Sequence, residues 1–167
     1  PFACLKSKSL RMIYRSNVPN VGTRLGVAKA ANWYSPFIRL TDQYLDLHVE
    51  DPFIWWEDDH YEMIAKDQSG KLTGEFQSGV HASSKNGIDW QICDPKKAYS
   101  RKIVWDDGTS TIMGSVERPQ LLFENGGPVC LYNAVADGPG GFRNANQTWN
   151  VATPLKNEDS LNNIENK

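Results

Sequence analysis

Two short segments of the chain place ionisable side chains, each including a carboxylic acid, just before a proline that opens an apolar run. They read Glu50-Asp51-Pro52-Phe53 and Glu117-Arg118-Pro119. An ionised side chain in apolar surroundings is costly to bury unless it is paired or used chemically. Two facing carboxyl groups can cleave a glycosidic bond, because one donates a proton to the leaving oxygen while the other activates water or attacks carbon. Asp51 and Glu117 are therefore candidates for such a pair.

The alternative is that these acids are structural. Asp51 and Glu117 could pair with Arg15, Arg118 or a lysine, or they could cap exposed strand ends. The pattern alone does not separate this alternative from catalysis. What decides between them is whether the fold brings the two carboxyl groups to one place.

Four further side chains could bind a substrate beside this pair. Arg118 could hold Asp51 ionised or bind a substrate hydroxyl or sulfate, although a rim salt bridge explains it equally well. Arg15 follows an apolar strand, where a sugar contact and an exposed strand end both fit the pattern. His81 alternates with apolar neighbours and could face either a channel or the core. Glu50, next to Asp51, is the fourth candidate.

The cysteines carry no metal-site signature. Cys4, Cys93 and Cys130 have no CxxC spacing and no histidine close by in the sequence. At most one disulfide can form among three cysteines. We therefore predict no zinc site and no metal ligands in this chain.

The elements that must position these residues repeat along the chain. Three segments begin with proline, continue with a short apolar run and end in a polar turn. The apolar runs are 1–5, 52–56 and 119–123. A second apolar run follows each turn, at 12–14, 61–65 and 129–132. Runs of this length, rich in β-branched and aromatic residues and bounded by turns, favour strands over helices.

Each repeat continues with further strands. Third strands are predicted at 25–28, 79–83 and 149–152, and fourth strands at 37–40 and 90–93. The turn 84–89 contains Asn86-Gly87, a pair that supplies the positive φ of a tight turn. No segment keeps the 3.6-residue apolar period of a helix. The sequence predicts an all-β chain of three antiparallel units with about four strands each.

Four-stranded units in series are typical of a β-propeller, whose four to eight blades surround a central channel. Because each blade buries its neighbour, three blades are too few for a ring. We therefore expect residues 1–156 to form part of a propeller, with blades starting near 1, 52 and 119, or to assemble with further chains. Residues 157–167 are expected to form a polar C-terminal tail.

This architecture would bring the two candidate acids together. The first strand of each blade lines the channel, so residues at the starts of these strands converge on one mouth. Asp51 and Glu117 stand at two such starts. They would then be neighbours in space although they are far apart in the sequence.

The ordered motifs resemble the five-bladed propellers of glycoside hydrolase families 43 and 32. The resemblance covers residues 1 to about 156 and rests on segments 50–53, 84–90 and 117–119. It implies that Asp51 tunes the acid or steadies the transition state, and that Glu117 is the general acid. It also implies an Asp on an earlier blade as base or nucleophile, which nothing before Pro1 supplies. We therefore expect the chain by itself to be inactive, as a fragment lacking that N-terminal blade.

The resemblance also sets expectations for substrate and surroundings. It implies a polysaccharide or oligosaccharide substrate and a secreted or periplasmic location. No cofactor is required, and a structural calcium ion in the channel is compatible with it. The alternative function is a non-catalytic carbohydrate-binding or assembly module, in which copies of the chain form a homo-oligomer that completes the ring. Hydrolysis would favour the first function, and sugar binding without turnover the second.

Charge and hydropathy indicate which other partners to expect. The chain has 18 basic and 20 acidic residues and a formal net charge of −2, so it lacks the positive field that phosphate backbones require. No apolar run approaches the roughly 20 residues of a membrane helix, and the first residues lack the basic segment and long apolar core of a signal peptide. We predict neither a nucleic-acid partner nor a membrane partner.

Overall fold

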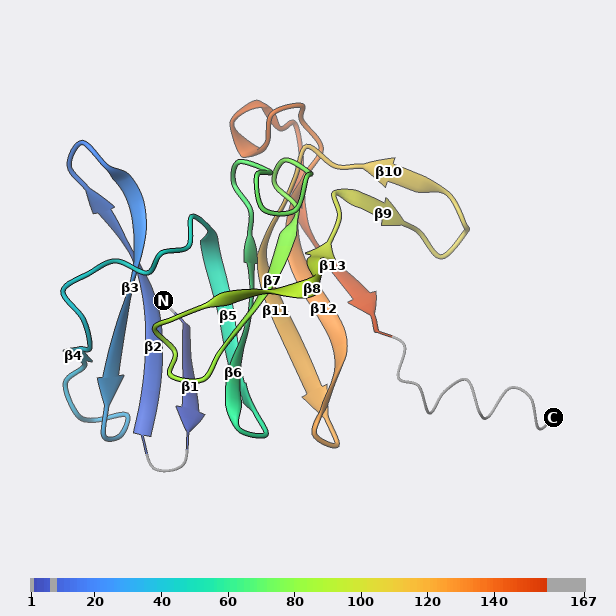
Figure 1. The fold of residues 1–167 in the computed structure, drawn as a ribbon. Helices are drawn as coiled ribbons and strands as arrows, with labels where there is room; N and C mark the ends of the chain where they lie inside the picture. Colours follow the sequence, from blue (N-terminus) through green and yellow to red (C-terminus); the bar gives the residue numbers. More distant parts are fainter. Residues whose placement is uncertain (1, 7–8, 156–167) are drawn as a thin grey trace.

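The computed structural model describes residues 2–6 and 9–155 and is all-β, with three antiparallel sheets side by side in chain order (Figure 1). The first sheet contains β1 (Phe2–Lys6), β2 (Ser9–Val18), β3 (Gly22–Ala30) and β4 (Ile38–Arg39). The second contains β5 (Glu50–Glu57), β6 (His60–Lys66), β7 (Gly79–Ser84) and β8 (Gln91–Tyr99). The third contains β11 (Ser115–Glu124), β12 (Gly127–Ala136) and β13 (Thr148–Pro154). A separate hairpin is made of β9 (Lys102–Val104) and β10 (Ser110–Ile112), and η1 (Phe142–Asn144) is a 3-10 turn.

Tight turns at polar residues set the up-and-down order of the strands. Between β11 and β12 the turn is Asn125-Gly126, with φ values of 52° and 86°. These positive values match the twist of a two-residue hairpin, and asparagine and glycine adopt them most easily. The β5–β6 turn uses Asp58 at a φ of 47° in the same way. Each strand therefore returns beside the one before it.

The sheets pack through the faces that their alternating apolar residues present. The core between the first two sheets is built from Ile13, Leu25 and Val27 on one side and from Ile54, Met63 and Val80 on the other. Between the second and third sheets, Phe53 and Ile64 pack with Leu131. The first strands of neighbouring sheets are in contact, β1 with β5 and β5 with β11. The beginnings of β5 and β11, which carry the two sequence motifs, are thereby held close together.

The all-β prediction is confirmed, and so are the positions of the predicted strands. The segments 25–28, 79–83 and 149–152 lie within β3, β7 and β13, and the insertion after residue 99 forms the β9–β10 hairpin. The first two sheets have four strands, and the third has three in the described part of the chain. The number of blades in a complete ring and the domain limits stay predictions. The predicted tail at 157–167 lies outside the described residues.

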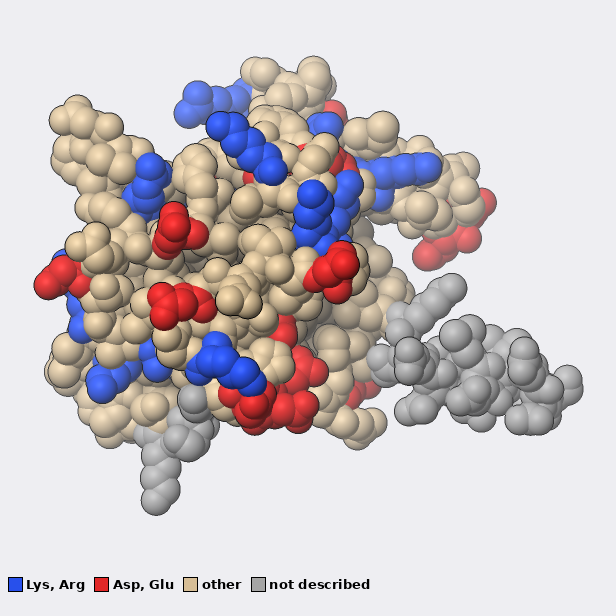
Figure 2. All heavy atoms as spheres, in the orientation of Figure 1, with Lys and Arg blue, Asp and Glu red and all other residues tan. Residues whose placement is uncertain are grey.

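The surface mixes charges. On the face shown in Figure 2, acidic and basic side chains occur together. Large apolar side chains are exposed in the β3–β4 connection, where Trp33 is 67% and Tyr34 is 99% accessible. Within residues 2–6 and 9–155, no helix is long and apolar enough to cross a membrane.

Candidate functional site

Both sequence motifs form the same backbone distortion. The register of the ladders breaks between Glu50 and Phe53 in β5 and between Glu117 and Gln120 in β11. In each bulge the residue before the proline has a positive φ, 49° at Asp51 and 52° at Arg118. A non-glycine residue in this region costs about 1–3 kcal/mol, and such residues cluster at functional sites. The two sheets thus repeat one strained motif, with a glutamate at the equivalent position in each.

A buried lysine joins the two bulges. The Nζ of Lys66 lies 3.0 Å from Oε2 of Glu50 and 3.1 Å from Oε1 of Glu117. The side chain of Lys66 is 5% exposed and each glutamate side chain is 11% exposed. Charges buried to this extent are only weakly screened, and each depends on its partner to offset the loss of hydration. One cation at the end of β6 therefore holds carboxylates from two sheets together.

Asp51 lies on the open side of this cluster. Its Oδ1 is 3.7 Å from Nη1 of Arg15, and the same nitrogen is 3.8 Å from Oε1 of Glu50. A cavity of about 500 Å³ is lined by Ile13, Tyr14, Arg15, Asp51, Pro52, Arg118 and Gln120. This volume lies within the range of small-molecule sites. Glu117 is not among the lining residues, and its carboxylate is paired with the buried Lys66.

Tyr99, at the end of β8, is close to both candidate acids. Burial raises the pKa of its phenol well above the usual range, and the negative charges of Asp51 and Glu117 raise that pKa further. Its hydroxyl is buried and has no hydrogen-bond partner in the described part of the chain. Buried polar groups are nearly always hydrogen-bonded, so each exception calls for an explanation. The Tyr99 phenol is therefore a buried, uncharged group packed beside these carboxylates.

Two glycines make room for tyrosine rings at this site. Gly79 is paired with Tyr99 in the β7–β8 ladder, and Gly26 is paired with Tyr14 in the β2–β3 ladder. A Cβ atom built on Gly79 would lie 2.2 Å from the Tyr99 ring, and one on Gly26 would lie 2.4 Å from the Tyr14 ring. Each ring therefore covers the backbone of its partner glycine. The ring can take this place only because glycine has no Cβ atom.

Replacing Gly79 by alanine should displace Tyr99 and lower the free energy of unfolding by about 1–3 kcal/mol, the usual cost of forcing extra atoms into a packed site. Urea unfolding followed by fluorescence measures this loss. Gly127→Ala is the matched control, because a Cβ there would meet nothing within 4 Å. We expect it to change the stability by less than about 0.5 kcal/mol. Equal losses in the two variants would contradict the proposed role of Gly79.

The two arginines occupy different places around Asp51. Arg15 provides the ion pair to Asp51, whereas the guanidinium of Arg118 lies over the ring of Phe142, 5.6 Å from its centroid. Of the alternatives for Arg118, a salt bridge to Asp51 is therefore absent among the described residues. Arg118 is exposed and still lines the cavity. Its donors remain available to a ligand.

His81 belongs to a different cluster. Its Nε2 is hydrogen-bonded to Oε2 of Glu62, and the ring of Trp55 is stacked parallel to it at a centroid distance of 6.3 Å. The alternation along β7 turns Val80 and Ala82 into the core with the first sheet and His81 to the opposite face. His81 is therefore not among the residues that line the cavity beside Asp51.

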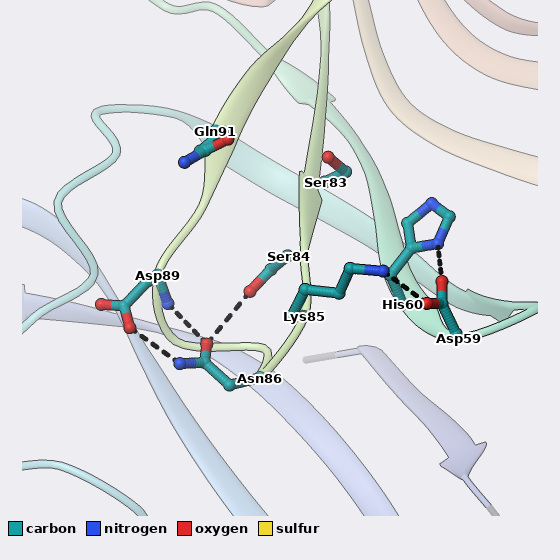
Figure 3. A pocket seen from close by; sticks show the side chains of 8 residues that line it. All are labelled: Asp59, His60, Ser83, Ser84, Lys85, Asn86, Asp89 and Gln91. Carbon is teal, nitrogen blue, oxygen red and sulfur yellow. Dashed lines mark hydrogen bonds and ion pairs between the residues drawn. The ribbon is translucent and has the colours of Figure 1, made fainter.

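A second cavity of about 500 Å³ lies at the turns of the second sheet (Figure 3). It is lined by Asp59, His60, Ser83, Ser84, Lys85, Asn86, Asp89 and Gln91. Asp59 lies 3.0 Å from Nδ1 of His60 and 2.5 Å from Nζ of Lys85. On the other side, Asn86 accepts the backbone N–H of Asp89 at 2.9 Å. The charged groups of this cavity and Asn86 thus already have partners within the protein.

Sequence reasoning missed several residues of the Asp51 site, and Lys66 is the most important of them. A register count comes within one residue of it, because the two-residue turn at Asp58-Asp59 pairs Glu57 with His60 and fixes the ladder as far as Phe53. A regular hairpin would pair Glu50 with Asp67, but the bulge shifts this pairing to Lys66. Tyr14, Tyr99 and Gln120 carry no signal that separates them from ordinary strand residues.

Comparison with solved structures shows which fold this is. The chain has a TM-score of 0.57 at 13% identity with a structure described as a glycoside hydrolase, covering 89% of this chain and 41% of that one. A structure described as a BT0996 RGII complex gives the same score and identity, covering 90% of this chain and 41% of that one. The GH32 β-fructofuranosidase BmSUC1 of Bombyx mori gives 0.50 at 16% identity, covering 93% of this chain and 34% of that one. The chain therefore shares its fold with part of these glycoside hydrolase structures.

The chain spans only about two-fifths or less of the length of these structures. No protein-family model matches it, and no curated protein matches it in sequence. At these identities the similarity establishes the fold and not the activity. The activity must be argued from the residues of the site.

Proposed function

We propose that this chain contributes the general acid and an assisting carboxylate to a glycoside hydrolase. The convergence of Asp51 and Glu117 from two sheets carries the proposal. Lys66 ties Glu117 to the neighbour of Asp51, and both carboxylates act on the buried phenol of Tyr99. The fold shared with glycoside hydrolase structures is a second, independent support.

The proposed mechanism gives each residue a physical task. To act as general acid, Glu117 has to leave its ion pair with Lys66 and take up a proton, which it then donates to the leaving oxygen of the glycosidic bond. Asp51 lies beside the cavity and stabilises positive charge that develops on the sugar ring. Arg15 and Arg118 line the same cavity and offer hydrogen bonds to sugar hydroxyls, while Glu50 orients Arg15 and Lys66.

A third carboxylate is needed as base or nucleophile. Among the described residues that line the cavity, Asp51 is the single acid. We propose that another segment or another chain supplies the missing group, as part of a five-bladed propeller to which residues 1–156 contribute. The chain by itself is then inactive, and its substrate is a polysaccharide or oligosaccharide met in a secreted or periplasmic setting. A structural calcium ion and a homo-oligomer that completes the ring belong to the same proposal.

A second candidate function is carbohydrate binding without hydrolysis. The position of Glu117 favours it, because this carboxylate lies on Lys66 and does not line the cavity. In this alternative, the ion pairs of Lys66 with Glu50 and Glu117 only stabilise the contact between the two sheets. Arg15, Asp51 and Arg118 then bind sugar hydroxyls in the cavity.

Hydrolysis and binding assays with Asp51→Asn distinguish these functions. A panel of polysaccharides and aryl glycosides is tested for turnover with the full-length protein and for binding by NMR with this chain. Catalysis predicts turnover that falls with Asp51→Asn, while binding alone predicts chemical-shift changes that this variant weakens. Asp42→Asn is the control, because the Asp42 side chain is fully exposed. Full activity of Asp51→Asn would rule out the proposed role of Asp51, and the absence of both turnover and binding would contradict both functions.

A further inference from the structure

A second group of side chains in the middle sheet has the composition of a metal site. Glu62 on β6, His81 on β7 and Cys93 on β8 each offer one ligand atom, and these atoms all lie within 4.8 Å of one another. The three residues come from three adjacent strands. None of them lines the cavity beside Asp51.

The strand register explains why these residues meet. Glu62 is opposite Ser83, and Ser83 is opposite Gln91. His81 and Cys93 lie two residues along from Ser83 and Gln91, so they share the same face of the sheet. Because the β-ladder is fixed by backbone hydrogen bonds, the three groups are brought together without rearrangement of the chain.

Glu62 is a buried acid whose partners are histidines. Its residue is 8% exposed, and within the described part of the chain its ion-pair partners are His60 and His81. Nε2 of His60 lies 2.5 Å from Oε1, which leaves Oε2 on the side of His81. Nδ1 of His60 is in turn held by Asp59 at 3.0 Å. A ligating carboxylate that is oriented by a hydrogen-bonded outer partner is a common arrangement in metal sites.

The chemistry of the donor set selects the metal. Thiolate and imidazole favour zinc among the divalent ions that proteins commonly bind, and a carboxylate completes many zinc sites. Bond lengths of about 2.0–2.3 Å in a tetrahedral zinc site put ligand atoms roughly 3.3–3.8 Å apart. Side-chain atoms that already lie within 4.8 Å of one another reach this geometry by small side-chain rotations. Calcium and magnesium prefer oxygen ligands and do not fit a set that contains sulfur.

We infer that Glu62, His81 and Cys93 bind one Zn²⁺ ion, with the fourth position open to water. Oε2 of Glu62, Nε2 of His81 and the thiolate of Cys93 are the ligands, and the Cys93 proton is released to solvent on binding. His60 holds the other oxygen of Glu62 and acts as a positioning residue. The ring of Trp55 lies parallel to that of His81 and restricts its rotation. His60, Ser83 and Gln91, which lie next to this group of residues on β6, β7 and β8, line the cavity of Figure 3.

Titration with Co²⁺, a spectroscopic substitute for Zn²⁺, tests this inference on the metal-stripped chain. We expect saturation at one ion per chain, with thiolate-to-Co²⁺ charge-transfer absorption that added Zn²⁺ abolishes. Cys93→Ser should remove this absorption, and His81→Gln should weaken binding by more than about 100-fold. His60→Gln should weaken it by about 10–100-fold, the usual effect of an outer partner.

The other two cysteines provide matched controls. Cys130 is free in the structure and lies on β12, so Cys130→Ser should leave the titration unchanged, as should Cys4→Ser. Circular dichroism of each metal-free variant shows whether it is folded, and His81→Gln keeps the test decisive if Cys93→Ser fails to fold. Absence of saturable binding, or charge-transfer absorption that survives in Cys93→Ser, would overturn the inference.

Discussion

Glu117→Gln should lower the rate of hydrolysis by about 10²–10⁴-fold on substrates with poor leaving groups, the usual contribution of a general acid. Glutamine keeps the size of the side chain but has no proton to donate to the leaving oxygen. Substrates whose leaving group departs without protonation should be affected much less. Steady-state kinetics of the proposed assembled propeller on a series of aryl glycosides of rising leaving-group pKa measures both effects.

The control for this variant is Glu124→Gln. Glu124 lies on the same strand, β11, but is exposed at its far end. We expect unchanged kinetics for Glu124→Gln at every leaving group. If Glu117→Gln lowers the rate equally for good and poor leaving groups, Glu117 does not act as the acid, and the loss reflects a structural change.

Lys66→Met should lower the free energy of unfolding by about 3–5 kcal/mol, because it leaves two buried carboxylates without their shared cation. The methionine fills a similar volume, so the loss reports charge and not a cavity. Urea unfolding measures it. Adding Glu50→Gln and Glu117→Gln to the variant should restore much of the stability, since amides carry no charge to be left unpaired.

Lys85→Met is the control for Lys66→Met. Lys85 also binds a carboxylate, that of Asp59 at 2.5 Å, but both side chains are more than two-thirds exposed. An exposed ion pair contributes little to stability, because water screens both charges. Similar small losses for Lys66→Met and Lys85→Met would show that the cluster between the sheets is not held by Lys66.

The sequence predicted the fold well where local signals sufficed. Turns such as Asn125-Gly126 and the alternation of apolar residues define the strands and their order, and the shared fold agrees with them. The approach of Glu50 and Glu117 followed from the repeat, because equivalent positions of neighbouring sheets lie side by side, and Asp51 is the residue next to Glu50. Their proximity thus required no knowledge of individual contacts.

Contacts that depend on exact register could not be predicted. Lys66 reaches Glu50 only because a bulge shifts the ladder by one residue, and a strained φ at Asp51 leaves no clear trace in the sequence. Arg15 rather than Arg118 pairs with Asp51, a choice that depends on how Phe142 is placed beside Arg118.

The prediction of no metal ligands stays a prediction. Cys93 has no histidine near it in the sequence, so spacing rules predicted no zinc site. In the structure, the ladder brings one possible ligand atom from each of Cys93, His81 and Glu62 within 4.8 Å of the others. Metal-site motifs with ligands a few residues apart in the sequence suit turns and helices. In a sheet, side chains from neighbouring strands come together although they are far apart in the sequence. The Co²⁺ titration decides between the sequence-based prediction of no metal site and the site inferred from the structure.

The central claim is that Asp51 and Glu117 act at one sugar-binding site. A crystal structure of the full-length protein with a bound oligosaccharide is the most direct measurement. We predict a sugar ring in the cavity lined by Tyr14, Asp51 and Arg118, with the glycosidic oxygen within hydrogen-bond distance of the Glu117 carboxyl group. An oligosaccharide bound elsewhere would contradict this claim. So would a Glu117 carboxyl group that stays paired with Lys66 and does not contact the sugar.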